Sequence, residues 1–369
     1  MPRPSSVTLG LALATTLAAT LAATLGCAGH RVHTTVRAEG PPISADDVRA
    51  IESVLAADSL EGRGTGTRGS MMAARYIARW FADAGLTPAG DSGFFQRVPM
   101  KQIVGRGGRR GAALVASASA LDTVPAERRL YGGNVVGVLV GSDPKLRGEV
   151  VLVDAHYDHL GVGTPERGDS IYNGADDDAS GTTTVMLVAR ALAQGQRPRR
   201  TVVFLATTGE EVGLVGTRWY IDHPVRPLAQ TVANLEIEMI GRPDSLVGGA
   251  GKAWLTGFDR SSMGQALRDA GVPIVADPRP AECFFERSDN IAFAYRGIPA
   301  HTLSTFNGHA DYHHATDEAD RLDYDHMARV IGSAVNAVRL LADGPRPAWA
   351  PNGRPTPPAP GQRSACRGG

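Results

Sequence analysis

Short runs of β-branched residues alternate with helical patterns along most of this chain, and no other feature restricts its fold as strongly. The apolar runs are bounded by Gly, Asp or Pro, as buried strands are, and they predict strands at residues 135–140, 149–155, 201–206, 232–237 and 299–304. Apolar residues at helical spacing predict helices at residues 70–84, 180–193, 262–270 and 325–342. Together these elements predict an α/β fold, a three-layer αβα sandwich with a mixed, mostly parallel central sheet. In such folds ligand sites lie beyond the carboxyl ends of the strands.

The two ends of the chain differ in composition from its middle. Residues 1–27 combine an early positive charge with an uncharged Ala/Leu/Thr stretch, which predicts a signal peptide and an exported protein: periplasmic, lipid-anchored or secreted, with a bacterial-type leader. Cys27 ends this stretch, and its lipidation would attach the protein to a membrane. Residues 28–42 are predicted to be a linker, and the Pro- and Gly-rich residues 344–369 a disordered tail. One catalytic domain is therefore expected at 43–343.

The charge balance bears on nucleic-acid binding, and the positions of the cysteines bear on disulfide formation. Lys and Arg number 38, as do Asp and Glu, so the formal net charge is zero and we expect no binding to nucleic acid. Of the three cysteines, Cys366 lies in the predicted tail, so we predict no disulfide between it and Cys283. The sequence leaves the oligomeric state open.

Histidines and carboxylates follow directly on several predicted strands. His156 ends one of them and could bind a metal through its ring, while Asp158 could steady a ligand from outside. Glu210 and Glu211 follow another strand, where one carboxylate could bind metal and the other could act as a general base. Taken alone, each motif also fits a solvated loop or a histidine that is merely hydrogen-bonded.

Further candidate ligands lie along the rest of the chain. Three consecutive carboxylates, at residues 176–178, precede a predicted helix, where the helix N-terminus, solvent or a cation could offset their repulsion. Glu238 follows a third strand, and His313 brings an imidazole back near the C-terminus. Two histidines and three carboxylates suit a pair of zinc ions, which need no cysteine.

The order of these motifs resembles the co-catalytic di-zinc aminopeptidases of peptidase family M28, which also includes relatives of glutamate carboxypeptidase. The resemblance covers about residues 46–340 and rests on the motifs at 60–66 (Leu-Glu-Gly-Arg-Gly-Thr-Gly), 156–158, 173–181, 210–214 and 312–317. It implies two zinc ions per chain, with protein ligands His156, Asp176, Glu211, Glu238 and His313. In this arrangement Asp176 bridges the ions. His156 and Glu238 complete one site, and Glu211 and His313 complete the other.

The resemblance also implies roles around the ligands. Glu210 would be the catalytic base, and positions around the ligands or the substrate are expected for Asp158, Asp177 and Asp289. The peptide bond between residues 176 and 177 is expected to be cis. The chain departs from the family pattern at Glu238, where many members carry Asp, and at Asn290, which follows Asp289 where members often have His.

The predicted function is that of a zinc exopeptidase that removes N-terminal residues from peptides. A metal-activated water would attack the scissile carbonyl, with Glu210 as the general base. Phe284, Phe285 and Phe306 are candidates for a side-chain pocket. Three alternatives remain: a glutaminyl cyclase with a single zinc, which Glu238 leaves open, a carboxypeptidase-type member, and a relative that binds without catalysis.

Overall fold

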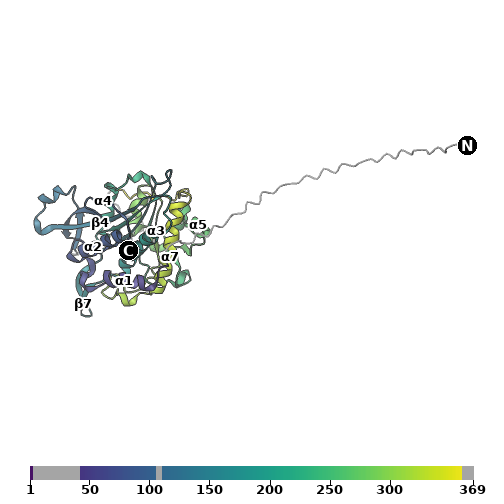
Figure 1. Cartoon of the computed structure of the whole chain (residues 1–369). Coiled ribbons are helices and arrows are strands. Elements are labelled where there is room, and N and C mark those ends of the chain that lie inside the picture. Colours follow the sequence, from purple (N-terminus) through teal and green to yellow (C-terminus); the bar gives the residue numbers. More distant parts are fainter. Residues whose placement is uncertain (3–41, 105–109, 360–369) are drawn as a thin grey trace. The chain divides into compact units, whose positions relative to one another are not determined.

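The computed structural model describes residues 1–2, 42–104 and 110–359. The chain divides into two units, residues 1–33 and 34–369, and every described helix and strand belongs to the second (Figure 1). The following description concerns this second unit.

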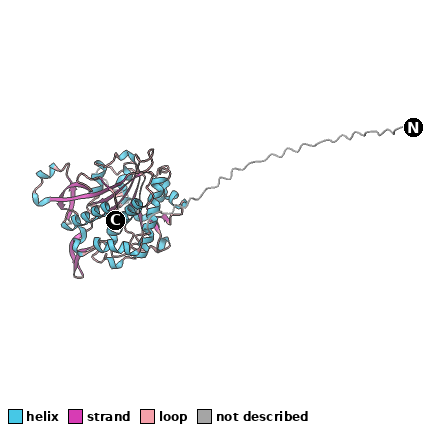
Figure 2. Cartoon of the chain, in the orientation of Figure 1, coloured by secondary structure: helices cyan, strands magenta, loops and turns pink. Residues whose placement is uncertain are grey.

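A mixed sheet forms the middle layer (Figure 2). Its strand order is β11-β10-β12-β9-β5-β8-β4-β2-β3, and β1 pairs with β4 outside this order. These strands are β1 (Thr87–Pro88), β2 (Phe95–Val104), β3 (Arg110–Leu114), β4 (Arg129–Leu139), β5 (Val150–His156), β8 (Thr201–Thr207), β9 (Thr231–Ile237), β10 (Ala253–Leu255), β11 (Ile274–Ala276) and β12 (Ala300–Ser304). The adjacent strands β12, β9, β5 and β8 pair in parallel, whereas β8, β4, β2 and β3 pair antiparallel. A separate hairpin joins β6 (Gly161–Glu166) to β7 (Asp169–Tyr172).

Helices cover both faces of the sheet. They are α1 (Ala45–Leu55), α2 (Arg68–Asp83), α3 (Gly181–Gln194), α4 (Val215–Asp222), α5 (Ser262–Asp269), α6 (Asn290–Tyr295) and α7 (Tyr324–Asp343). The helices α1, α2, α3 and α7 pack on one face, and α4 and α6 pack on the other. The predicted αβα sandwich with a mixed sheet is therefore confirmed, with the parallel pairing concentrated in the centre.

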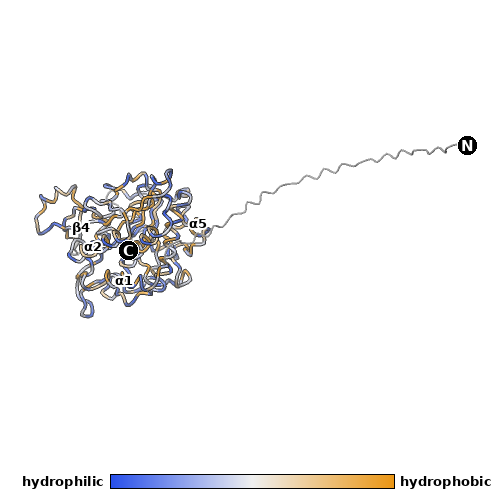
Figure 3. The backbone as a smooth tube through the Cα atoms, in the orientation of Figure 1, coloured by the Kyte–Doolittle hydropathy of each residue, from blue (hydrophilic) through white to orange (hydrophobic). Residues whose placement is uncertain are grey.

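The central strands are apolar because both of their faces are covered. Along β5, Val151 and Val153 enter the core beneath α3 and α7, whereas Val150 and Leu152 enter the core beneath α4 and α6. Successive side chains of a strand point to opposite faces, so a strand buried on both sides reads as a continuous apolar run. The tube in Figure 3 shows this apolar character in the interior.

Every predicted helix and strand is present, although several boundaries differ. The largest difference is in β4, which begins at Arg129 because its first half pairs antiparallel with β2. The sequence analysis did not predict α1, whose first turn is capped by Ser44 in a capping box with Asp47. It also left out the antiparallel strands β2 and β3, which occupy the edge of the sheet.

The predicted disordered tail is contradicted over its first part. The indole of Trp349 donates a hydrogen bond to the Gly297 carbonyl, and the backbone N–H of Ala350 donates to that of Arg260. These contacts attach the segment to the residues that flank α5 and α6. Residues 360–369 lie outside the described residues, as do almost all of the predicted signal peptide and linker, including Cys27.

Two further observations concern membranes and cysteines. Within the described ranges, none of the helices combines the length and the apolar character that a membrane crossing requires. Cys283 is disulfide-bonded, whereas the sequence analysis predicted no disulfide between Cys283 and Cys366. The other two cysteines lie outside the described residues.

Candidate metal centre

The carboxyl ends of three parallel strands bring the predicted site residues together. β5 ends at His156, β8 is followed by Glu210 and Glu211, and β9 is followed by Glu238. Because β5 pairs in parallel with both β8 and β9, these residues meet at one edge of the sheet.

The first cluster contains His156, Asp177 and Glu238. The His156 Nε2 atom lies 3.3 Å from Asp177 Oδ1 and 3.9 Å from Glu238 Oε1. One ligand atom from each residue lies within 4.8 Å of the others, so a single ion could contact all three. The His156 and Asp177 side chains are buried, whereas that of Glu238 is 23% exposed, so the cluster opens on the Glu238 side.

The second cluster shares Asp177 with the first and adds Glu211 and two histidines. The His313 Nε2 atom lies 3.1 Å from Asp177 Oδ2 and 3.3 Å from Glu211 Oε2. On the buried side, His159 Nδ1 lies 2.8 Å from Glu211 Oε1 and 3.9 Å from Asp177 Oδ2. Sequence reasoning did not single out His159, although its place three residues after His156 on the same loop was the signal available.

The carboxylate shared by the two clusters is that of Asp177, one position after Asp176, which the sequence analysis expected to bridge the ions. The Asp176 carboxylate accepts a hydrogen bond from the Gly241 backbone N–H at 2.7 Å and lies 2.9 Å from His309 Nε2. Its oxygens therefore face away from His156. The cis peptide bond is likewise one position later than predicted, between Asp177 and Asp178.

Asp317 holds the acidic turn in this orientation. Its carboxylate accepts hydrogen bonds from the backbone N–H groups of Asp176 and Asp177 at 3.0–3.1 Å. At the other end of the turn, Asp178 accepts from the N–H groups of Gly181 and Met239, both at 3.0 Å. The carboxylates of Asp176 and Asp178 thus accept hydrogen bonds from the surrounding backbone. The carboxylate of Asp177 faces the histidines.

Asp158 links the His156 loop to the loop that carries Glu210. The Asp158 backbone carbonyl lies 3.1 Å from His156 Nδ1, which sets the orientation of the ring. Its carboxylate accepts from the N–H groups of Gly209 and Glu210 at 2.7 and 3.2 Å, and from the Thr65 hydroxyl at 2.6 Å. Asp158 thus supports His156, as predicted, but through its backbone carbonyl. Its side chain instead orders the loop that carries Glu210.

Asp289 lies beneath the site and is fully buried. Its carboxylate accepts a hydrogen bond of 2.6 Å from the hydroxyl of Thr207, the last residue of β8. Asp289 thus lies under the strand end, which is one of the two kinds of position, around the ligands or against the substrate, that were expected for it.

The electrostatic environments of the two adjacent glutamates are opposite. Burial, reinforced by the charge of Glu211, raises the pKa of Glu210 well above its ordinary value, against the opposing charge of His156. Burial also acts to raise the pKa of Glu211, but two neighbouring imidazoles outweigh it and hold this pKa at about 2. Adjacent carboxyl groups whose pKa values are pushed apart are suited to different tasks, one as a proton carrier and the other as an anionic ligand.

The polar atoms of the clusters fit metal ions. Among the described residues, the buried atoms without a hydrogen-bond partner include His156 Nε2, both ring nitrogens of His159 and Glu211 Oε1. Buried polar atoms that converge without hydrogen bonds are costly unless a cation satisfies them. Imidazole nitrogen and carboxylate oxygen are donors that zinc takes in proteins.

Two hollows lie next to the clusters. The smaller is lined by Glu238 together with Trp254, Phe284, Phe306 and Tyr312. Two of the three predicted pocket aromatics therefore line it. The third, Phe285, is buried in the core beneath α6 instead.

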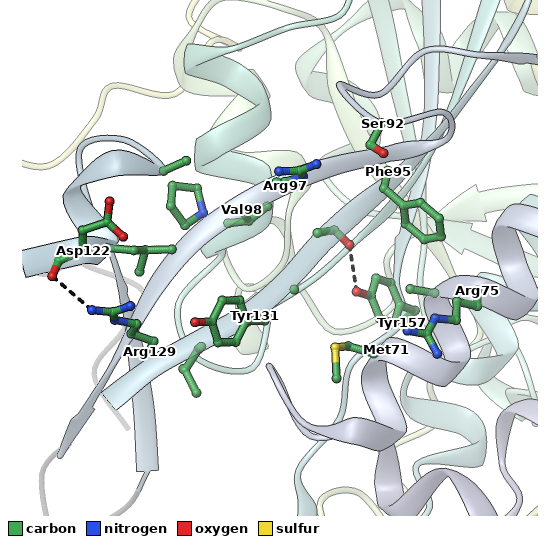
Figure 4. A pocket seen from close by; sticks show the side chains of 17 residues that line it. Met71, Arg75, Ser92, Phe95, Arg97, Val98, Asp122, Arg129, Tyr131 and Tyr157 are labelled. Carbon is green, nitrogen blue, oxygen red and sulfur yellow. Dashed lines mark hydrogen bonds between the residues drawn. The ribbon is translucent and has the colours of Figure 1, made fainter. Parts of the chain in front are cut away.

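The larger hollow, a cavity of about 490 Å³, lies between α2, β2 and β4 (Figure 4). Its wall includes Tyr157, whose hydroxyl donates to the Gly133 carbonyl at 2.8 Å. Because Tyr157 follows His156 directly, this cavity lies beside the loop of the first cluster, and Glu238 is not part of its lining.

Two linked His–carboxylate clusters at the carboxyl ends of parallel strands suit metal-dependent hydrolysis. The model of peptidase family M28 matches residues 134–338. The chain therefore belongs to peptidase family M28.

Solved structures with the same fold include a zinc aminopeptidase from Bacillus subtilis, at a TM-score of 0.59 and 15% identity, covering 82% of this chain and 96% of that one. An aminopeptidase from an Aneurinibacillus strain matches at a TM-score of 0.57 and 16% identity, over 86% of this chain and 98% of that one. These likenesses establish the fold.

Fungal proteins are among the curated relatives. Leucine aminopeptidase 2 of Trichophyton equinum is 29% identical over 218 residues, which is 57% of this chain and 41% of the relative. A vacuolar membrane protease of Penicillium rubens is 28% identical over 196 residues, 52% of this chain and 18% of the relative. The chain thus spans less than half the length of these relatives. Relatives named for the vacuolar membrane contradict the predicted bacterial-type exported location, so that prediction is wrong.

Proposed function

We propose that this chain is a zinc aminopeptidase that holds two ions and cleaves the N-terminal residue from peptides. The observation that carries the proposal is the position of Asp177, whose two carboxylate oxygens face different clusters, Oδ1 toward His156 and Oδ2 toward His313. One carboxylate between two sets of ligands is suited to join two ions in a single centre.

The ligands divide between two sites. His156 and Glu238 would complete the first site, Glu211 and His313 the second, and Asp177 would belong to both. When bound, zinc supplies Lewis acidity toward a water molecule and toward the scissile carbonyl. The longer side chain of Glu238 supports the first site despite the departure from Asp, because its carboxylate comes within 3.9 Å of His156.

Glu210 is the proposed general base. Its backbone N–H is fixed by Asp158, and burial raises the pKa of its carboxyl well above the ordinary value, which favours its taking up a proton. Glu210 would take a proton from the attacking water and return it to the departing amine. This cycle leaves the carboxylate as it started.

The aromatic hollow beside Glu238 supports a preference for apolar N-terminal side chains. Phe284 and Phe306 contact each other edge to face at 5.7 Å, and Tyr312 stacks on His313 at 3.9 Å. An apolar side chain held here would place its neighbouring peptide bond beside the clusters. The name of the Trichophyton equinum relative, leucine aminopeptidase, agrees with such a preference.

The test is zinc content per chain together with hydrolysis of leucyl-p-nitroanilide by the wild type and by Glu210→Gln. We expect two zinc ions in both proteins and a loss of kcat of about 10²–10⁴-fold in the variant. Glu282→Gln, which changes an exposed carboxylate outside both clusters, is the matched control and should keep full activity.

Other outcomes would redirect the proposal. Near-normal activity of Glu210→Gln would reject Glu210 as the base. One zinc per chain with cyclisation of N-terminal glutamine would indicate a cyclase, and a protein without zinc or activity would indicate a binding function.

A further inference from the structure

We infer that His159 is an additional protein ligand of the second metal site, which makes the two sites unequal. The inference rests on the proposed two-ion centre and adds a donor outside the ligand set of that proposal. The second site would be closed by protein donors, and the first would remain open to water and substrate.

The contacts of His159 carry the inference. Its Nδ1 atom lies 2.8 Å from Glu211 Oε1, yet neither atom has a hydrogen-bond partner among the described residues. The two atoms are therefore close but are not aligned for a hydrogen bond. This is the arrangement expected of two metal-ligand atoms whose lone pairs point toward one ion. Asp177 Oδ2 lies 3.9 Å from the same nitrogen, on the side that faces His313.

The surroundings of His159 hold its ring in place. Its side chain is fully buried, and its backbone N–H donates to the Arg63 carbonyl at 3.3 Å. Gly174 packs directly on the ring: a Cβ at this glycine would lie 2.4 Å from His159 Cγ, and its φ of +57° also favours glycine. A ring fixed before an ion arrives is preorganised as a ligand.

The donor sets of the two clusters then differ in number and exposure. The first offers one imidazole and two carboxylates, with Glu238 partly exposed beside the aromatic hollow. The second offers two imidazoles and two carboxylates, and only His313 among these side chains is appreciably exposed, at 33%. Four protein donors are typical of zinc sites without an open position, whereas three leave a place for water or substrate. We therefore expect the second site to bind zinc more tightly than the first.

If His159 is only a counter-ion, its removal is expected to change zinc affinity in the opposite direction. If His159 were only a protonated partner of Glu211, removing it would free this carboxylate and strengthen metal binding. If it is a ligand, removing it weakens binding at the second site. Metal affinity therefore separates the two roles without any measurement of catalysis.

The experiment is stepwise zinc affinity, measured by competition with a chromophoric chelator, for the wild type, His159→Gln and His314→Gln. We expect His159→Gln to lower the tighter of the two affinities by about tenfold or more, on the scale of the effects known for residues around metal ligands. His314 is the matched control, because its side chain is 53% exposed and pairs with Glu166 outside both clusters. Unchanged or increased affinity in His159→Gln would overturn the inference.

A second measurement needs no variant of a buried residue. X-ray absorption of the wild type loaded with one equivalent of zinc counts the imidazoles around the tighter site. Two imidazoles are expected, and one would overturn the inference. The proposed function fails separately, if the wild type binds two ions but does not hydrolyse peptides. A wild type that binds no zinc would overturn both.

Discussion

Three consecutive aspartates perform three different tasks in this protein. Asp176 accepts from the Gly241 backbone N–H, Asp177 faces the histidines, and Asp178 accepts from the N–H of Gly181, the first residue of α3. These tasks follow from the backbone path of the turn, which Asp317 fixes through two N–H groups. Side-chain identity is the same at all three positions and cannot distinguish them.

Replacing single aspartates by asparagine tests whether Asp177, and not Asp176, is the carboxylate shared by the two clusters. We expect Asp177→Asn to weaken both zinc sites by at least about tenfold, because an amide nitrogen replaces a charged oxygen shared by both clusters. Asp176→Asn should keep two zinc ions, since its carboxylate contacts Gly241 and His309 instead. The measurement is zinc per chain after gel filtration. Loss of zinc from the Asp176 variant alone would contradict the assignment.

At the scale of elements, one buried arginine ties together the segments that carry the ligands. Arg63 lies just before α2 and is fully buried. Its guanidinium donates to the carbonyls of Leu55, Tyr157, Asn173 and Gly174 at 2.6–2.8 Å. Arg63 therefore joins three segments by hydrogen bonds: the end of α1, the loop after β5 and the acidic turn before α3.

Arg63→Met should lower both stability and zinc affinity. Each buried carbonyl left without a donor costs about 1–3 kcal/mol, so we expect a clear fall in the melting temperature. Arg63→Lys should recover only part of the loss, because an ammonium cannot reproduce the planar fork of donors. Arg68→Met, which changes an arginine with a 65% exposed side chain, is the control. Lower melting temperature with unchanged zinc affinity would show that Arg63 supports the fold alone.

At the scale of the whole molecule, the stability of the described unit should depend on pH through Glu52. This side chain of α1 is fully buried, and neither carboxyl oxygen has a hydrogen-bond partner among the described residues. Burial raises the pKa of Glu52 from 4.5 to about 8, against the opposing charge of Arg63. The folded protein therefore keeps the proton in a range where the unfolded chain has lost it.

The sign of the effect follows from this difference. The contribution of Glu52 to stability is fully present below about pH 4.5 and is lost progressively as pH rises toward 8. Each unit of pKa difference corresponds to about 1.4 kcal/mol, so the loss amounts to several kcal/mol. Glu52→Gln should raise the melting temperature more at pH 8 than at pH 5. The exposed Glu127→Gln should not, and equal effects of Glu52→Gln at both pH values would contradict the prediction.

Much of the fold could be predicted because its signals are local. The apolar runs that became β5, β8 and β9 are continuous because helices cover both faces of the sheet. The edge strands β2 and β3 and the capped helix α1 lack such runs, so they were not predicted. The residues that follow Asp343 were misjudged because their order comes from contacts with α5 and α6, far away in sequence.

By itself the sequence determined the family, the order of the elements and the loops that carry the chemistry, because strand periodicity and motif spacing are local properties of the chain. Tertiary structure decided which atoms face one another. It selected Asp177 over Asp176, placed His159 beside Glu211, buried Asp289 and used Arg63 as an anchor. These outcomes depend mainly on contacts between residues far apart in the chain and on backbone dihedrals in irregular turns, and neither can be read from the local sequence.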